Sequence, residues 1–231
     1  MKTLLGMPIS QVIETVGPLF SKDQENSGIL ASVSMAQFLL ESKNGQSELA
    51  THANNYFGMK TMLSGNSWPN STWTGEVYEK TTTEYYNGEK HFVKAKFRKY
   101  KSVEDSIYDH SAYLLGSRNS KGYRYEGLKG CADHRKAITI IKQGGYATDP
   151  NYVDLIMKQI NKYNLKRFDV SQHRKFKTSI INLKVRKGPS VNDEIVTTIP
   201  IGVYTITEIV NGWGKLKSGL GWIYLQYAKE V

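Results

Sequence analysis

Residues 28–53 read GILASVSMAQFLLESKNGQSELATHA, and the apolar half of this stretch decides the fold. Between residues 29 and 40, nearly every helical turn carries apolar or small side chains, which is typical of a helix buried around most of its circumference. Asn44 and Gly45 follow, and both residue types tolerate the left-handed backbone in which helices end. The sequence therefore predicts a central buried helix that ends in a chain reversal.

Glu41 is the charged residue that closes this apolar run. A carboxylate in the last turn of a buried helix faces the negative end of the helix dipole and a drier medium, and both disfavour its charged form. Its pKa should therefore be raised, which suits a general acid. Alternatively, Glu41 is the first solvated residue after a core helix, and this stretch alone does not decide between the two.

The charge of the chain favours an anionic partner. Of its 231 residues, 39% are hydrophobic and 23% charged, with a formal net charge of +10. Residues 1–165 carry 20 basic and 16 acidic side chains, whereas residues 166–231 carry 11 and 5. Nucleic acid, an anionic membrane surface and an acidic cell-wall polymer all fit this excess, and charge alone does not choose among them.

The ends and the cysteine content exclude other classes. Cys131 is the single cysteine, so no intrachain disulfide is possible. The N-terminus, MKTLLGMPISQVIE, has no apolar core long enough for a secretory signal or for a membrane helix of ~20 residues. Either the protein is made in the cytosol and leaves by another route, or a leader is missing from this sequence.

Periodicity divides the chain into a mostly helical part and a small β part. Further helices are expected at residues 9–20, 47–53, 103–115, 132–142 and 150–163. Residues 73–99 alternate around Asn87-Gly88, a type I′ turn pair, and predict a β-hairpin. Residues 166–177 lose periodicity and are basic, which predicts a linker. The short β-rich runs beyond it, separated by turn residues, predict a small β-barrel.

Two carboxyl groups and many aromatic rings suit carbohydrate chemistry. Glycoside cleavage needs an acid for the leaving oxygen and a second group that activates water or stabilises the transition state. Glu41 and a glutamate of the hairpin could supply this pair, although any hairpin glutamate is also a plausible solvated strand charge. The aromatic residues in these segments are Trp68, Trp73, Tyr85, Tyr86, Tyr100, Tyr113, Tyr146 and Tyr152. The five histidines lack HExxH spacing and no Gly-rich phosphate loop occurs, so we expect no metal and no cofactor.

Several ordered motifs resemble a known family. AQFLLESKNGQSELA with NNYFGMK, then TTTEYYNGE with KAKFRKY, then GGYATDPNY, are similar to the glucosaminidase domain of flagellar peptidoglycan hydrolases and autolysins, glycoside hydrolase family 73. The resemblance covers residues 5–165. It implies an α+β, mostly helical, lysozyme-like domain with a β-hairpin lobe, and hydrolysis of the β-1,4 bond between N-acetylglucosamine and N-acetylmuramic acid in peptidoglycan.

The resemblance also implies roles for individual residues. The catalytic acid falls on Glu41, the second carboxylate on Glu84 and the functional tyrosine on Tyr146, and an N-acetyl group of the substrate could replace Glu84. The candidate substrate-binding residues are Asn55, Phe57, Trp68, Tyr85, Tyr100, Asp149 and Tyr152. Turn chemistry for Asn55 and helix capping for Asp149 are the simpler alternatives. The family usually has Gly-Trp-Gly after the Glu-Ser pair, whereas Lys43-Asn44-Gly45 stands here, so a tryptophan beside the acid is missing.

The C-terminal motifs LKVRKGPSVNDEIVTTIPIG and VNGWGKLKSGLGWIYLQY are similar to bacterial SH3 (SH3b) cell-wall-binding domains. Trp213 and Trp222 are candidate wall-binding residues, with a place in the barrel core as the alternative. We thus expect a glucosaminidase domain at 1–165, a linker at 166–177 and an SH3-like barrel at 178–231. This arrangement looks like a monomeric phage or prophage endolysin, made in the host cytoplasm without a signal peptide. It would act on the bacterial wall after release and bind neither nucleic acid nor a membrane interior.

Two other functions stay open. A lytic transglycosylase on the same scaffold would need only Glu41 and would release an anhydro sugar. A non-catalytic wall or nucleic-acid binder would depend on the net charge alone and would release no reducing ends.

Overall fold

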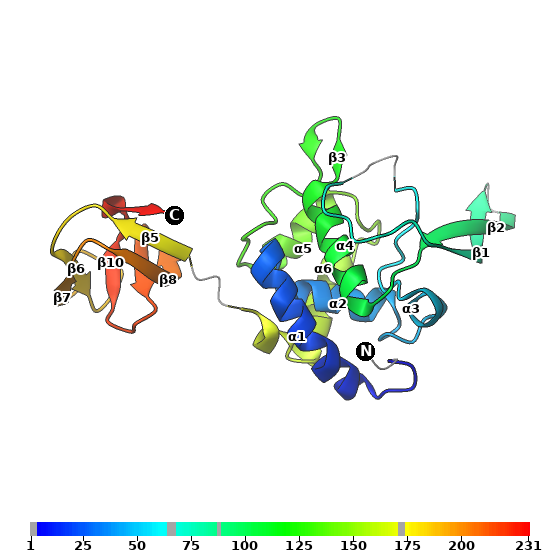
Figure 1. Cartoon of the computed structure of the whole chain (residues 1–231), viewed down its shortest axis with the longest axis horizontal. Helices are drawn as coiled ribbons and strands as arrows, with labels where there is room; N and C mark the ends of the chain where they lie inside the picture. The colour runs from blue at the N-terminus through cyan, green and yellow to red at the C-terminus, as the bar shows by residue number, and fades with distance from the viewer. Residues whose placement is uncertain (1–3, 64–67, 87–88, 171–173) are drawn as a thin grey trace. The chain divides into compact units, whose positions relative to one another are not determined.

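The computed structural model describes the chain except residues 1–3, 64–67, 87–88 and 171–173, and only the backbone of residues 82–86, 90 and 91. The chain separates into two compact units, Met1–Val170 and Ser171–Val231 (Figure 1). Each has a hydrophobic core of its own.

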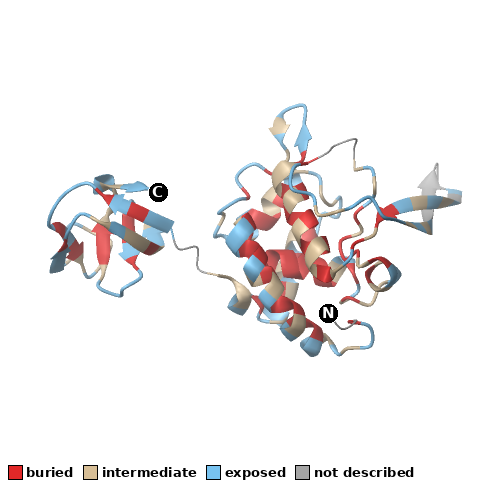
Figure 2. Cartoon of the chain, in the orientation of Figure 1, coloured by how far each residue is buried: buried red, intermediate tan, exposed pale blue. Residues whose placement is uncertain are grey.

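Helices are the main secondary structure of the first unit, and α2 lies at its centre. The described α-helices are α1 (Ile9–Ser27), α2 (Ala31–Glu41), α3 (Glu48–Ala53), α4 (Val103–Gly116), α5 (His134–Gln143) and α6 (Tyr152–Lys162). Every residue from 31 to 39 of α2 is buried, as the red ribbon in Figure 2 shows. Helix α2 packs against α1, α5, α6 and the short 3-10 helix η1 (Leu165–Phe168). The buried helix predicted from the apolar run is therefore the core of this unit.

Helix α2 ends in the chain reversal that Asn44 and Gly45 predict. Lys43, Asn44 and Gly45 have φ angles of 52°, 59° and 82°. The Gly45 backbone N–H donates to the Ser42 hydroxyl at 2.7 Å, which satisfies a donor at the turn. Glu41 is thereby left at the surface immediately before the reversal.

Helix α1 continues beyond the predicted end at residue 20, through Gly17 and Pro18. The reason lies far along the chain, because the Phe168 ring of η1 packs where a side chain at position 17 would be. A Cβ at that position would come within 2.1 Å of the ring. Gly17 is a packing residue of the helix and does not break it.

The described residues of the expected linker, 166–170 and 174–177, form parts of the two units. Helix η1 and Asp169 belong to the first unit. The Asp169 carboxylate accepts both the backbone N–H and the hydroxyl of Ser32, each at 2.8 Å, and so caps the start of α2. Residues 174–178 form the first strand of the second unit, β5 (Arg174–Thr178).

The predicted hairpin is present. Strands β1 (Val77–Tyr86) and β2 (Glu89–Arg98) pair antiparallel from Val77 with Arg98 to Tyr86 with Glu89. The predicted turn, residues 87–88, lies outside the described residues. Near its base the hairpin contacts α3, where Glu48 accepts the Tyr78 hydroxyl at 3.0 Å and pairs with Lys80 at 2.9 Å. A second, very short pair is β3 (Arg118–Asn119) with β4 (Gly122–Tyr123).

The second unit is an open antiparallel sheet, which corrects the predicted closed barrel. Its other strands are β6 (Leu183–Arg186), β7 (Ile195–Ile199), β8 (Val203–Val210), β9 (Trp213–Leu216), β10 (Trp222–Tyr224) and β11 (Ala228–Glu230), with the 3-10 helix η2 (Leu225–Tyr227) before β11. The hydrogen-bonded order is β11-β5-β8-β9-β10-β6-β7. Among the described residues, the end strands β11 and β7 do not pair with each other, so the sheet stays open. Turn signals predict the strands but not whether the sheet closes.

None of the described helices combines the length and the apolar character needed to cross a membrane.

Candidate active site

Glu41 stands at the end of α2 where a substrate can reach it. Its side chain is exposed, yet the surrounding protein displaces enough water to raise the pKa of its carboxyl above the usual 4.5. Burial raises the pKa of the Tyr146 and Tyr152 phenols, and the Glu41 charge raises both further. The two tyrosines predicted from the sequence are therefore within the electrostatic reach of the predicted acid.

Gln37 supports this arrangement from one turn earlier on α2. Residues four apart share a helix face, so Gln37 lies beneath Glu41. Its side-chain amide is fully buried and donates to the Tyr152 hydroxyl at 2.8 Å. Tyr152, at the start of α6, is 3% exposed. The contact fixes Tyr152 against α2, and little of its surface is left for a sugar.

Tyr146 is held from behind by a buried histidine. It lies in the loop between α5 and α6, and its hydroxyl is 3.1 Å from Nε2 of His110 on α4. The His110 ring meets Tyr146 edge to face and stacks on Phe57, with centroids 3.8 Å apart. Phe57, expected near the sugar, is 5% exposed and serves as the wall behind His110.

His110 is not among the site residues predicted from the sequence, where it counted only as one of five histidines without metal-ligand spacing. The available signal was helical periodicity, because His110 follows Ile107 by three residues and precedes Leu114 by four, and both of these are core residues of α4.

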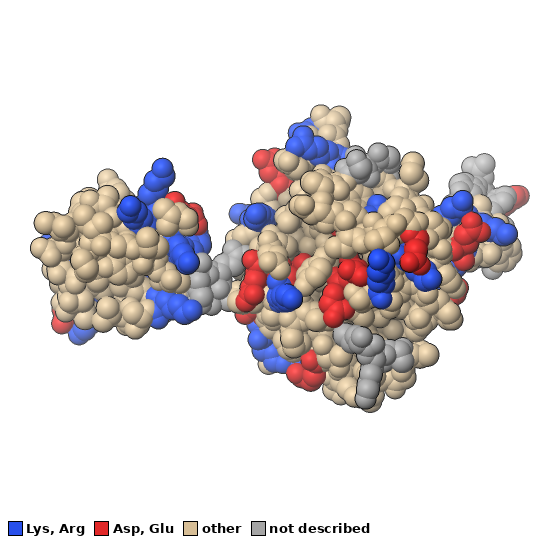
Figure 3. All heavy atoms as spheres, in the orientation of Figure 1, with Lys and Arg blue, Asp and Glu red and all other residues tan. Residues whose placement is uncertain are grey.

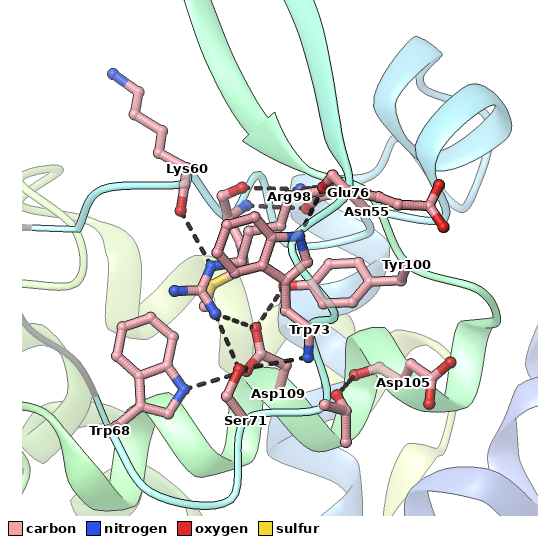
Figure 4. Close-up of polar contacts among 12 residues, drawn as sticks. Asn55, Lys60, Trp68, Ser71, Trp73, Glu76, Arg98, Tyr100, Asp105 and Asp109 are labelled. Carbon is pink, nitrogen blue, oxygen red and sulfur yellow. Dashed lines mark hydrogen bonds and ion pairs between the residues drawn. The ribbon is translucent and has the colours of Figure 1, made fainter.

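A buried carboxylate next to His110 braces the base of the hairpin. Asp109 is fully buried and receives hydrogen bonds from four side chains (Figure 4). The donors are Arg98 Nη1 at 2.8 Å, Tyr100 Oη at 2.6 Å, Trp68 Nε1 at 3.1 Å and Ser71 Oγ at 2.5 Å. We call these five residues the Asp109 cluster. Since Arg98 ends β2 and Asp109 lies on α4, the cluster ties the hairpin to the helical body.

The Arg98 guanidinium is enclosed by aromatic rings as well as paired. It lies 4.1 Å from the Trp68 ring centroid and 4.6 Å from that of Trp73. The Arg98 and Asp109 side chains are 6% and 0% exposed. An ion pair this well buried is costly to break from one side, because the remaining charge has neither water nor a partner.

Three residues predicted to bind sugar have their polar groups engaged inside the protein. Asn55 is 1% exposed, donates to the carbonyls of Met59 and Arg98, and accepts the Met59 N–H, all within 2.9 Å. Trp68 and Tyr100 donate to Asp109. These contacts give all three residues structural roles at the base of the hairpin. A sugar contact by any of them stays a prediction.

Of the remaining predicted site residues, the structure describes the side chain of Asp149 but only the backbone of Glu84 and Tyr85. Asp149 is exposed, and its Oδ1 accepts the Asn151 N–H at 2.7 Å in the turn before α6, but it does not cap the helix, which begins at Tyr152 after Asn151. Glu84 and Tyr85 are placed only as backbone, in β1 opposite His91 and Lys90. Their side chains lie outside the described atoms, so the predicted roles of Glu84 and Tyr85 stay predictions.

Trp213 and Trp222 lie on the face of the second sheet that points away from its core. Leu216 of β9 and Ile223 of β10 are core residues, so alternation along each strand places both tryptophans on the opposite face. Neighbouring side chains cover them to 6% and 8% exposure. The Trp213 ring is 5.1 Å from that of Tyr224.

Basic side chains are more frequent than acidic ones on the second unit. Residues 171–231 include nine basic and four acidic side chains. Figure 3 shows lysine and arginine gathered around β5, whereas on the visible face of the first unit they alternate with acidic residues. An anionic polymer would be attracted to such a surface.

The chemistry available at the first site is that of a single reachable acid. The described side chains contain no group of three or more His, Cys, Asp or Glu that could hold a metal ion. Glu41 combines access from solvent, a raised pKa and two neighbouring phenols. This combination suits proton donation to a leaving oxygen.

Comparison with known proteins places this site in a family. The family model named Glucosaminidase, described as mannosyl-glycoprotein endo-β-N-acetylglucosaminidase, matches residues 17–165. The match covers more than half of the chain, and the chain therefore belongs to this family of glycoside hydrolases.

Individual relatives agree with the family match. Exo-glucosaminidase LytG of Bacillus subtilis is 34% identical over 145 residues, which are 63% of this chain and 48% of that protein. Peptidoglycan hydrolase FlgJ of Salmonella typhimurium is 34% identical over 163 residues, 69% of this chain and 47% of that protein. The chain thus spans about half the length of these curated relatives.

A solved structure supports the fold of the first unit. The catalytic domain of the autolysin Auto from Listeria monocytogenes matches with a TM-score of 0.60 at 27% identity, over 72% of this chain and 91% of that domain. The mostly helical, lysozyme-like fold predicted for this part of the chain is confirmed.

We predict that Asp109→Asn destabilises the first unit by about 3–5 kcal/mol, because the Arg98 cation stays buried without its counter-charge. Chemical denaturation of residues 1–170 measures this free energy of unfolding. The matched control is Glu79→Gln, which removes the exposed pair with Lys96 on the same hairpin and should change it by less than about 1 kcal/mol. Equal, small losses in the two variants would show that the Asp109 cluster does not brace the hairpin.

Proposed function

We propose that this protein is a peptidoglycan hydrolase that cleaves the β-1,4 bond between N-acetylglucosamine and N-acetylmuramic acid. One arrangement carries the proposal: Glu41 is exposed with a raised pKa at the end of α2, its charge acts on Tyr146 and Tyr152, and Gln37 one turn earlier holds Tyr152 at 2.8 Å. The glucosaminidase family match and the peptidoglycan hydrolases among its relatives supply the substrate class.

In this mechanism Glu41 donates its proton to the glycosidic oxygen as the bond from the anomeric carbon to that oxygen breaks. A water molecule then adds to the anomeric carbon, its hydroxyl forming the new reducing end and its second proton passing to a base. That base is Glu84 or, after attack by the neighbouring N-acetyl oxygen, the regenerated Glu41 carboxylate. Tyr146 lies beside Glu41 and would contact the sugar whose bond is cleaved.

A lytic transglycosylase is the second candidate, because Glu41 with its raised pKa would be enough for it. A transglycosylase needs one such group, which first donates the proton and then accepts one from the sugar hydroxyl that closes the anhydro ring. Mass spectrometry of the released fragments separates the two reactions, because the hydrolytic product is heavier by one water.

We also propose that the second unit is an SH3b-type module that binds the cell wall. Its basic excess supports this role. Trp213 and Trp222 remain the candidate wall-binding residues, although neighbouring side chains cover them to 6% and 8% exposure. The pairing of a hydrolase with such a module supports a further proposal, that the protein is an endolysin of a phage or prophage. It would be made in the host cytoplasm and act on the wall after release.

We expect Glu41→Gln to lower wall lysis by ~10²–10⁴-fold without loss of fold, because the amide keeps the shape of the carboxyl and removes the transferable proton. Release of reducing ends from purified walls measures the loss. The control is Glu25→Gln, which changes an exposed glutamate of α1. Retention of more than about a tenth of the activity would sink the assignment.

The pH profile of the unmodified protein follows from the same residue. Only the protonated acid donates, so activity falls as pH rises through the pKa of Glu41. Because loss of water raises that pKa, the fall should lie above pH 4.5, the ordinary value for glutamate.

Glu84→Gln should cause a milder loss than Glu41→Gln. A two-stranded arm braced mainly at its base is poorly fixed at its far end, so without substrate the Glu41 and Glu84 carboxyls should stand wider than the ~6.5–9.5 Å of inverting enzymes. Closure of the arm over a glycan would then complete the site. Parallel reducing-end assays compare the variants, and a crystal structure without ligand gives the separation. Equal losses, or a rigid pair at short range, would contradict this account.

Removal of the second unit should separate cleavage from adhesion. Residues 1–170 should cleave soluble glycan fragments as the full chain does but sediment less with whole walls, because the module only raises local concentration. The fragment has to end at 170, since ending at 165 removes Asp169 and its cap on α2. Equal sedimentation of residues 1–170 and the full chain would argue against a wall-binding module.

A further inference from the structure

His110 is a fully buried titratable residue to which the proposed mechanism assigns no step. Its ring lies between the Phe57 ring and Tyr146. Nε2 is 3.1 Å from the Tyr146 hydroxyl, and Nδ1 has no hydrogen-bond partner within the described part of the chain. The ring is buried and one of its nitrogens faces the Tyr146 hydroxyl, so its role at the site needs a physical explanation.

The imidazole is neutral at any pH at which the protein would act. Burial lowers the pKa of His110 to about 3, because the charged ring has no water around it. A neutral imidazole carries a single N–H, on Nδ1 or on Nε2. The two tautomers have opposite consequences for Tyr146.

If the proton is on Nδ1, the Nδ1–H is a buried donor without an acceptor, while Nε2 accepts the phenolic proton of Tyr146. If the proton is on Nε2, that N–H donates to the phenolic oxygen, and only an acceptor on Nδ1 is left unpaired. Orphaned buried N–H donors are rarer in proteins than under-satisfied acceptors. The contacts therefore favour the Nε2–H tautomer.

We propose that His110 is a positioning residue: it donates its Nε2–H to the Tyr146 oxygen and so leaves the phenolic O–H free to donate to the substrate beside Glu41. The group that accepts this hydrogen bond would be a carbonyl oxygen, such as that of the acetamido group of an N-acetyl sugar. Tyr146 keeps this proton, since burial and the Glu41 charge raise the pKa of its phenol. The inference rests on the proposed function only for the identity of the substrate.

Nitrogen NMR of the unmodified full chain, with ¹⁵N-labelled histidine, tests the tautomer without any activity measurement. The His110 signals are those absent from the spectrum of His110→Gln. We expect a protonated Nε2 and an unprotonated Nδ1 at neutral pH. A protonated Nδ1 would overturn the proposal, and this result stands whether or not the protein proves to cleave peptidoglycan.

Two substitutions test the consequence for catalysis. His110→Phe keeps a flat ring against Phe57 but removes the donor, and it should lower kcat by about three- to tenfold, the range for one lost hydrogen bond. His110→Gln should recover most of this loss, because the amide nitrogen of Gln is as many bonds from Cα as Nε2 and can donate to the same oxygen. A Gln variant no better than the Phe variant would contradict a donor role.

Combining His110→Phe and His110→Gln each with Tyr146→Phe shows whether His110 acts by positioning Tyr146 or only by stabilising the fold. If His110 acts through the phenol, the Phe and Gln variants should have equal kcat there, within about twofold, since residues that act as a unit are not additive. If the kcat values of the Phe and Gln variants differ as much without the Tyr146 hydroxyl as with it, His110 acts on the site by another route. Should His110→Phe fail to fold, the NMR result and the kcat of the Gln variant still decide the proposal. If the unmodified protein does not cleave peptidoglycan, that result contradicts only the proposed function.

Discussion

Enclosure of α2 is the constraint on which the first unit depends. A helix that other elements surround has to satisfy the free backbone groups at both ends with partners from elsewhere in the chain. At the start, the Asp169 carboxylate accepts the Ser32 N–H. At the end, the chain reverses through Lys43, Asn44 and Gly45 and leaves Glu41 at the surface. The acid thus stands at the exposed end of a helix that is otherwise packed against the rest of the unit.

Helix α4 connects the two other parts of the site. Its consecutive residues Asp109 and His110 are both fully buried but face different partners. Asp109 holds Arg98 at the base of the hairpin, and His110 holds Tyr146 in the loop before α6. One helix therefore sets the position of the hairpin that carries Glu84 and of the tyrosine that stands beside Glu41.

Sequence patterns predict what depends on neighbours along the chain. The apolar run to residue 40, the Asn44-Gly45 reversal and the hairpin strands are local signals, and the structure has all three. Contacts across the chain are not predictable in this way. The Asp109 cluster gathers donors from positions 68 to 100, and the path of α1 through Gly17 depends on Phe168. Closure of the second sheet likewise depends on two end strands whose pairing no turn signal encodes.

The junction between the two units has a mechanical consequence. Val170, the last residue of the first unit, is clamped by the Gln24 side chain, which accepts its N–H at 3.0 Å and donates to its carbonyl at 2.6 Å. The same Gln24 oxygen accepts the Ala31 N–H at the start of α2. Tension transmitted along the chain from a tethered second unit would thus be borne by this clamp and by the Asp169 cap. Both act on the first turn of α2, at the opposite end of the helix from Glu41.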